Sequence, residues 1–146
     1  MGKLRHFELS EFLKSDVAKS RNIDNTPTFE IVEHIEELVD NFLEPMRNAL
    51  GLPVVVSSGY RCKKLNTAVG GVYNSAHLTG YAADITCPYT TFAKFKTFVV
   101  DWAKKTGTKF DQIILETEAK SGKRWLHVGW KDSLGRQRGQ ILNIDK

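Results

Sequence analysis

The spacing of apolar residues predicts two long helices. Between residues 28 and 50 they recur every three or four positions, as expected for a helix with one buried side. These residues are Ile31, Ile35, Leu38, Val39, Phe42 and Met46. Residues 90–105 repeat the pattern with Phe95, Phe98, Val99 and Trp102, and Gly107 follows as a typical helix end. We interpret both apolar stripes as core.

Local residue chemistry predicts where the first helix begins and bends. Thr26 before Pro27 is a typical cap followed by proline in the first turn, and Gly51 marks the end. Pro45 should kink or divide this helix near residues 41–42, because proline lacks an N–H and crowds the preceding turn. His34 lies on the polar side of the helix, so we expect it at the surface.

Other segments predict short strands and helices. A β-branched run at residues 54–58 indicates a buried strand, and residues 81–86 indicate a second one that projects Asp84 away from the face of its neighbours. Residues 111–117 and 124–130 are strand-like and joined by a short polar turn, which predicts a hairpin; residues 139–144 could add an edge strand. Short helices are expected over residues 7–20 and 61–69, with a loop over residues 72–80. The sum is an α+β fold: a single domain, residues 1–146, in which helices back one small, largely antiparallel sheet.

Composition narrows the class of protein. The 146 residues are 41% hydrophobic and 26% charged, as in a soluble globular domain, and no apolar run could span a membrane. The N-terminus is too polar for a signal peptide, so the protein is made in the cytoplasm without one or the sequence lacks its leader. The net charge is +4, but the basic residues are interspersed with acidic ones, which argues against nucleic-acid binding. Two cysteines, Cys62 and Cys87, are too few for a disulfide framework, and we expect reduced thiols.

The candidate chemistry is a metal site. His77 and Asp84 are separated by a glycine-containing turn, and an imidazole and a carboxylate suit a catalytic zinc, which usually takes three protein ligands and a water. His127, between two tryptophans in the second hairpin strand, is the candidate third ligand. An aspartate is disfavoured in a strand and needs a reason to be there. Spacing alone leaves open that the histidines are ordinary surface or core residues.

Longer motifs carry a family resemblance. The segments SSGYR, NTAVGG, SAHLTGYAAD and WLHV resemble the zinc D-Ala-D-Ala carboxypeptidases and related phage endolysins, within the superfamily shared with lysostaphin-like peptidases and Hedgehog amino-terminal domains. The likeness extends to FELSEFLKSDVAKS, IDN, LEPMR and FDQIILE, nearly the whole chain. It implies a Hedgehog/D-Ala-D-Ala-peptidase-like fold and a Zn²⁺ cofactor.

The resemblance also implies roles for individual residues. His77, Asp84 and His127 correspond to the zinc ligands. Arg61 matches the arginine of the family's SGYR motif, which would orient the substrate or stabilise charge on the scissile carbonyl, as a permanent bidentate donor can. Ser75 is assigned to the substrate-binding loop, which it would brace through hydrogen bonds.

The general base departs from the family pattern. Many relatives carry an acidic residue three positions before the last histidine, where this chain has Arg124. Glu116 is the best replacement, provided that the hairpin register sets it on the face of His127. Glu118 and Asp111 are the alternatives.

The resulting expectation is a zinc metallopeptidase that cuts the stem peptide of bacterial peptidoglycan. It would act as a D-Ala-D-Ala carboxypeptidase or an endopeptidase, as a monomer on the cell wall, released by a holin if it is a phage or prophage endolysin. No nucleic-acid or membrane partner is expected. The alternative is a non-catalytic, zinc-stabilised module that binds cell wall or protein.

Overall fold

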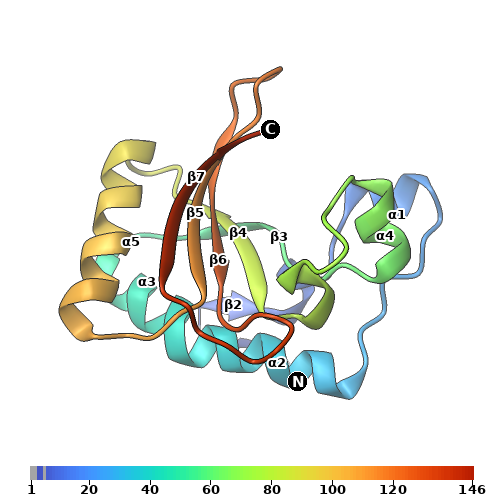
Figure 1. Ribbon diagram of the computed structural model, residues 1–146, viewed down its shortest axis with the longest axis horizontal. Helices are drawn as coiled ribbons and strands as arrows, with labels where there is room; N and C mark the ends of the chain where they lie inside the picture. The colour runs from blue at the N-terminus through green and yellow to red at the C-terminus, as the bar shows by residue number, and fades with distance from the viewer. Residues whose placement is uncertain (1–2, 5) are drawn as a thin grey trace.

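A five-stranded sheet forms the centre of the protein, which the computed structural model describes over residues 3–4 and 6–146 (Figure 1). The strands, in spatial order, are β3 (Val55–Ser58), β4 (Ala82–Thr86), β6 (Arg124–Gly129), β5 (Gln112–Thr117) and β7 (Gln140–Asp145). Neighbouring strands are antiparallel except β5 and β7, which are parallel. The expected α+β fold with a largely antiparallel sheet is confirmed.

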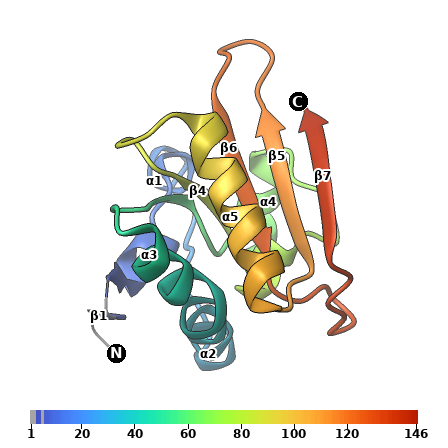
Figure 2. The ribbon, with the colours of Figure 1, turned by 90° about the vertical axis from the view of Figure 1, so that its left-hand side faces the viewer.

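Helices cover one face of this sheet and shorter elements lie beyond the other. Helix α5 (Phe92–Thr106) crosses the sheet on the side that Figure 2 turns toward the viewer, with α3 (Glu44–Leu50) beside it. On the opposite side lie α1 (Asp16–Ser20), α4 (Lys63–Ala68) and the 3-10 turn η3 (Ala76–Thr79) (Figure 1). None of the described helices is long and apolar enough to cross a membrane.

Strand alternation divides the sheet into an apolar and a polar face. Ala83, Ile85, Leu126, Val128 and Ile113 are buried in the hydrophobic core. Their sequence neighbours point the other way, because successive side chains of a strand lie on opposite faces. Asp84 and His127 therefore share the face that looks toward α4 and η3.

The long helix over residues 28–50 is distorted where proline predicts it. It consists of α2 (Phe29–Leu38), a π-helical turn η2 (Val39–Leu43) and α3. Pro45 stands at the start of α3 and cannot donate a backbone N–H to the turn before it, which explains the change of pitch. The predicted cap at Thr26 is wrong, because the hydroxyl of Thr28 accepts the N–H of Ile31 at 3.3 Å.

The prediction of one amphipathic helix over residues 7–20 is also wrong. Strand β2 (Phe7–Glu8) pairs with β1 (Lys3–Leu4), and η1 (Leu9–Phe12) and α1 follow. Pairing and the complete burial of Phe7 and Phe12 outweigh the helical pattern. Met1, Gly2 and Arg5, part of the segment compared with a signal peptide, lie outside the described residues.

The two edges of the sheet differ from expectation in one respect. Strand β7 is an edge strand, as predicted. Strand β3 is the other edge, not a buried strand: Val56 is buried, Val55 is exposed, and a register shift follows between Val56 and Ser58.

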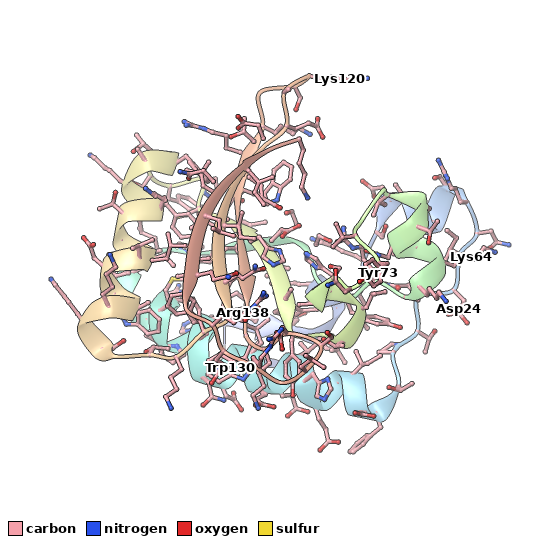
Figure 3. All side chains as sticks on the ribbon, viewed as in Figure 1. Asp24, Lys64, Tyr73, Lys120, Trp130 and Arg138 are labelled. Atoms are coloured by element: carbon pink, nitrogen blue, oxygen red, sulfur yellow. The ribbon has the colours of Figure 1, made fainter. Side chains whose placement is uncertain are left out.

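An ion pair closes the segment that leads into β7. The buried Asp111 accepts hydrogen bonds from Nε and Nη2 of Arg138, both at 2.8 Å, and from the backbone N of Arg138 at 3.1 Å. Figure 3 labels Arg138 beside the sheet. Asp111 is therefore engaged as an anchor for β7, which argues against its use as a base.

Candidate metal centre

Three side chains converge on the polar face of the sheet. Oδ1 of Asp84 lies 3.2 Å from Nε2 of His77 and 3.2 Å from Nδ1 of His127. One ligand atom from each residue lies within 4.8 Å of the others, and all three residues are buried. Tetrahedral zinc with bonds of about 2.0–2.1 Å separates its ligand atoms by about 3.3 Å. The spacing around Asp84 therefore fits one zinc ion.

Local structure explains how the three residues meet. Asp84 of β4 and His127 of β6 are direct partners in the antiparallel register. His77 comes from η3, whose first turn is capped by Ser75: its Oγ accepts the N–H of His77 at 3.1 Å. Ser75 therefore braces the loop, as expected. Gly80, at φ +84°, turns the chain into β4 where it passes close to Ile31, a conformation that other residues rarely adopt.

The tautomer of His77 argues for a cation between these groups. Nδ1 of His77 lies 2.6 Å from the carbonyl oxygen of Gly59, which can only accept, so Nδ1 carries the proton. In the neutral ring, Nε2 then presents a lone pair to Oδ1 of Asp84. Burial lowers the pKa of His77, although Asp84 opposes this, and so favours the neutral form. Two facing acceptors suit a bound metal ion.

The charge state of Asp84 also suits metal binding. Burial alone would raise its pKa, but positive charge and hydrogen-bond donors beside it, which the two histidines supply when protonated and a cation would supply in their place, lower the pKa below the ordinary value. Asp84 is therefore a carboxylate at neutral pH, the form that ligates zinc.

Arg61 stands at the edge of this site. Its backbone N–H donates to the carbonyl of His77 at 3.0 Å. Burial lowers the pKa of its guanidinium, and the negative charges of Asp84 and Glu116 oppose that effect. Arg61 therefore interacts electrostatically with both carboxylates. Nε of Arg61 is buried without a hydrogen-bond partner among the described residues. The side chain thus carries an unused buried donor and a positive charge that interacts with Asp84 and Glu116.

Glu116 lies on the same face as His127. In the β5–β6 register Ile114 is the partner of His127 and Glu116 is the partner of Trp125, two positions along each strand. Oε1 of Glu116 accepts the indole N–H of Trp125 at 2.6 Å, and Oε2 lies 3.0 Å from Nζ of Lys146. The hairpin register therefore places Glu116 on the face of His127, the condition on which its choice as a candidate base depended.

The other acidic candidates lie elsewhere. Asp111 is paired with Arg138. Glu118 is exposed in the hairpin turn and accepts a hydrogen bond from Ser121. Arg124 occupies the opposite face, with its guanidinium 5.0 Å from the ring centroid of Phe92. Sequence spacing missed the contacts of Trp125 and Lys146 with Glu116, because they depend on the strand register.

A hydrogen-bonded cluster around Glu37 ties helix α2 to the segments that follow η3 and β6. The Glu37 carboxylate accepts from the Tyr81 hydroxyl at 3.0 Å, from Nε1 of Trp130 at 2.9 Å and from Nζ of Lys131 at 2.8 Å. Burial and this contact raise the pKa of Tyr81 to about 12. His34, expected at the surface, is only partly exposed, because its ring stacks on Tyr81 with 4.0 Å between the ring centroids. Stacking across elements leaves no trace in helical spacing.

Both cysteines are free thiols. Cys87 is buried, and the sulfur of Cys62 accepts the N–H of Leu65 at the start of α4. Neither belongs to the candidate metal group.

Comparison with known proteins gives a family match and one related enzyme. The family model described as peptidase M15 matches residues 5–117. A 44-residue stretch is 46% identical to the zinc D-Ala-D-Ala carboxypeptidase of Streptomyces albus G, and covers 30% of this chain and 17% of that relative. The chain thus matches less than a fifth of the relative's length. The family match stops before His127, so the position of this third side chain rests on the sheet register.

Proposed function

Because this chain belongs to the peptidase M15 family, we propose that it hydrolyses a peptide bond of the peptidoglycan stem at a zinc ion held by His77, Asp84 and His127. The observation that supports this most directly is the 3.2 Å spacing of two histidine nitrogens around one oxygen of Asp84. Peptidoglycan is suggested by the name of the related carboxypeptidase.

The donor set fits the metal that the family uses. Two imidazoles and one carboxylate leave a fourth position for water or substrate, the pattern of catalytic zinc sites. Zinc bound here would supply Lewis acidity, which polarises the scissile carbonyl and makes water a stronger acid.

The proton steps are assigned to Glu116. Its carboxylate would take the proton of the attacking water and return it to the leaving amine. Trp125 and Lys146 fix the two oxygens of this carboxylate, and the diagonal position on the neighbouring strand places its Cα about 7–8 Å from that of His127. A side chain of this length can reach a water beside His127.

Arg61 would recognise the substrate and stabilise the reaction's negative charge. Its N–H groups could bind a peptide carboxylate or the oxyanion that forms at the scissile carbonyl. The positive charge at the edge of the site suits the carboxylate of a carboxy-terminal residue, which favours carboxypeptidase cleavage over cleavage within a crosslinked peptide.

Digestion of purified cell walls tests the proposal. Clearing of the walls should stop with a chelator and return with zinc, and mass spectrometry of the released muropeptides would identify the bond cut. Zinc binding without any change in the muropeptides would favour the alternative of a non-catalytic wall-binding module.

We extend the proposal to an endolysin-like role on the cell wall, where the net charge of +4 would favour binding to an anionic polymer.

A further inference from the structure

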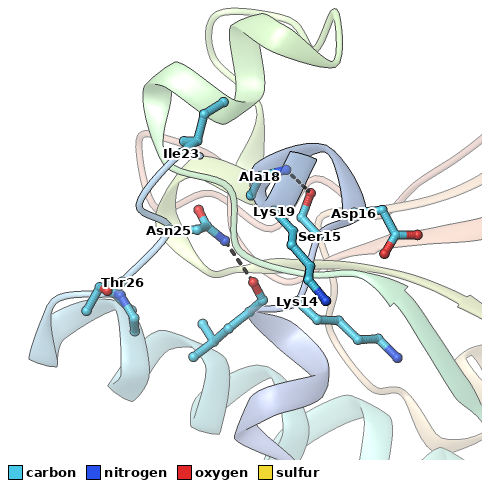
Figure 4. Close-up of a pocket in the computed structure, with 10 residues that line it drawn as sticks. Lys14, Ser15, Asp16, Ala18, Lys19, Ile23, Asn25 and Thr26 are labelled. Carbon is cyan, nitrogen blue, oxygen red and sulfur yellow. Dashed lines mark hydrogen bonds between the residues drawn. The ribbon is translucent and has the colours of Figure 1, made fainter. Parts of the chain in front are cut away.

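The carboxamide of Asn25 binds the backbone on both sides of Arg61. Its Nδ2 donates to the carbonyl of Tyr60 at 3.0 Å, and its Oδ1 accepts the N–H of Cys62 at 2.8 Å. The same Nδ2 donates to the carbonyl of Leu13 at 3.1 Å, drawn in Figure 4 as a dashed line from Asn25. The carboxamide thus satisfies one backbone acceptor and one backbone donor of this turn, as the backbone of a neighbouring strand would.

The rest of the turn is held by two other segments. The N–H of Tyr60 donates to the carbonyl of Phe12 at 2.7 Å, and the N–H of Arg61 donates to the carbonyl of His77 at 3.0 Å. A Cβ on Gly59 would lie 2.6 Å from the backbone of Phe12, so only glycine fits there. The backbone that carries Arg61 is therefore fixed from three directions.

The side chain of Arg61 has no comparable anchor. Its Nε is buried without a partner, and no carboxylate among the described residues lies within ion-pair distance of its guanidinium. The backbone at Arg61 sets the point from which the side chain starts, so a shift of this backbone would move the guanidinium with it. Asn25 supplies the bonds on both sides of that backbone.

We propose that Asn25 is a positioning residue that aims Arg61 at the substrate, an inference that rests on the role of Arg61 proposed above. Asn25 belongs to a segment without helix or strand, in the wall of a cavity of about 590 Å³ that contains none of the three candidate ligands (Figure 4). It contacts neither His77 nor Asp84 by a hydrogen bond. The turn that Asn25 holds also contacts His77, through the carbonyl of Gly59 and the N–H of Arg61, so an effect that passes through Arg61 must leave zinc binding unchanged.

A double-mutant cycle on wall digestion tests this route. Asn25→Ala should lower the initial rate on purified cell walls by about 10- to 100-fold, the usual scale for a displaced binding group. In the Arg61→Ala background the same substitution should change the rate by less than about twofold, because the residue through which it acts is gone. Equal losses in both backgrounds would overturn the proposal. Asn41→Ala, which removes an exposed amide bonded to a helix carbonyl, is the matched control and should leave the rate unchanged.

A second measurement does not depend on turnover. In Asn25→Ala, hydrogen exchange at the N–H of Cys62 should accelerate by about tenfold or more, while zinc content and exchange in β6 stay as in the parent protein. Unchanged exchange at Cys62, or loss of zinc, would contradict the positioning role.

If Asn25→Ala does not fold, Asn25→Asp serves instead. It keeps the acceptor for the N–H of Cys62 but places a carboxylate against the Tyr60 carbonyl, so the rate of wall digestion should fall while the N–H of Cys62 stays protected from exchange. A parent protein that digests no wall would refute the proposed function, while the exchange result would still decide the role of Asn25.

Discussion

At the scale of single residues, two acceptors face each other in the metal centre, Nε2 of His77 and Oδ1 of Asp84. The bond from Nδ1 of His77 to Gly59 leaves Nε2 as a lone pair directed at Asp84, and the carboxylate offers no hydrogen in return. Without a cation such an arrangement is unfavourable. A bound metal ion would remove this unfavourable contact. Replacing the carboxylate with a hydrogen-bond donor should also remove it in the metal-free protein.

Asp84→Asn should abolish zinc binding without destabilising the metal-free protein. The amide is the same size, and its NH₂ group can donate to both histidine nitrogens, where each new bond contributes about 1 kcal/mol. Zinc titration and thermal unfolding in chelator would measure the two effects. His77→Ala is the comparison: it should lose zinc and also stability, because the bond to Gly59 disappears. A metal-free Asp84→Asn protein that melts well below the metal-free parent would contradict this view of the cluster.

Glu116→Gln should keep zinc and lose turnover. The amide oxygen can still accept from Trp125, but the group no longer takes a proton, and general-base catalysis typically contributes about 10²–10⁴-fold. Wall-digestion rates and metal analysis on the same samples would show the separation. Glu118→Gln, the same chemical change in the exposed turn, should digest walls at the parental rate. An active Glu116→Gln enzyme would remove Glu116 from the mechanism and leave the metal site intact.

The prediction of this site rested on the family resemblance more than on residue chemistry. An imidazole pair and a strand aspartate are suitable metal ligands, but spacing alone left open that the histidines are ordinary residues, and the match to the family's motifs assigned the three ligands and Arg61. The bonds from Trp125 and Lys146 to Glu116 require the strand pairing to be known, so no spacing rule reaches them.

At the scale of elements, the periodicity of the sequence predicted the helices and the hairpin whose formation depends on residues close together in the chain. Helix α5, the distortion before Pro45 and the hairpin of β5 and β6 all follow patterns carried by contiguous residues. The segment over residues 7–20 did not, because a strand pair and the burial of two phenylalanines decide its path. Edge and centre positions of strands such as β3 likewise depend on partners far along the chain.

The contacts of Glu37 in α2 with Tyr81, before β4, and with Trp130 and Lys131, after β6, should make stability pH-dependent. Hydrogen bonds from Lys131, Trp130 and Tyr81 lower the pKa of Glu37 from 4.5, although burial opposes them. The stabilisation is therefore present above about pH 4.5 and is lost as pH falls through the lowered pKa. Denaturant unfolding should show Glu37→Gln less stable than the parent at neutral pH, with the difference shrinking in acid. A difference that is constant over this range would mean that the charge of Glu37 plays no part. Glu33→Gln, an exposed change on the same helix, controls for the loss of one charge.

The attachment of β7 should depend on Arg138. Removing its side chain in Arg138→Ala leaves the buried Asp111 without its main donors, which costs about 1–3 kcal/mol. Arg136→Ala breaks an exposed pair with Asp132 and should stay within about 0.5 kcal/mol of the parent. Chemical denaturation of both variants makes the comparison. Equal effects would show that burial of Asp111 is unimportant.

At the scale of the whole molecule, core and metal site occupy opposite faces of one sheet. The buried apolar residues pack between the sheet and helices α2, α3 and α5, while Asp84 and His127 face the other way, toward η3, which carries His77. The core is therefore complete without metal, unlike that of a zinc finger.

Metal removal should lower stability without unfolding the protein. Free zinc at about one hundred times its dissociation constant adds about 2.7 kcal/mol to the free energy of unfolding. Circular dichroism in chelator should keep the helical signal, and the melting temperature should rise when zinc is returned. Collapse of the signal on chelation would show that metal and core form one cooperative unit.

The direct pairing of Asp84 with His127 has a consequence for how the protein matures. Forty-three residues separate these partners, and helix α5 and strand β5 are made between them. A growing chain can present His77 and Asp84 early, but the third nitrogen arrives only when β6 aligns against β4 in the correct register. A slip of one residue would turn His127 toward the helices. Zinc would then bind only chains in which β4 and β6 are correctly aligned, and so would stabilise the native register over the misaligned one.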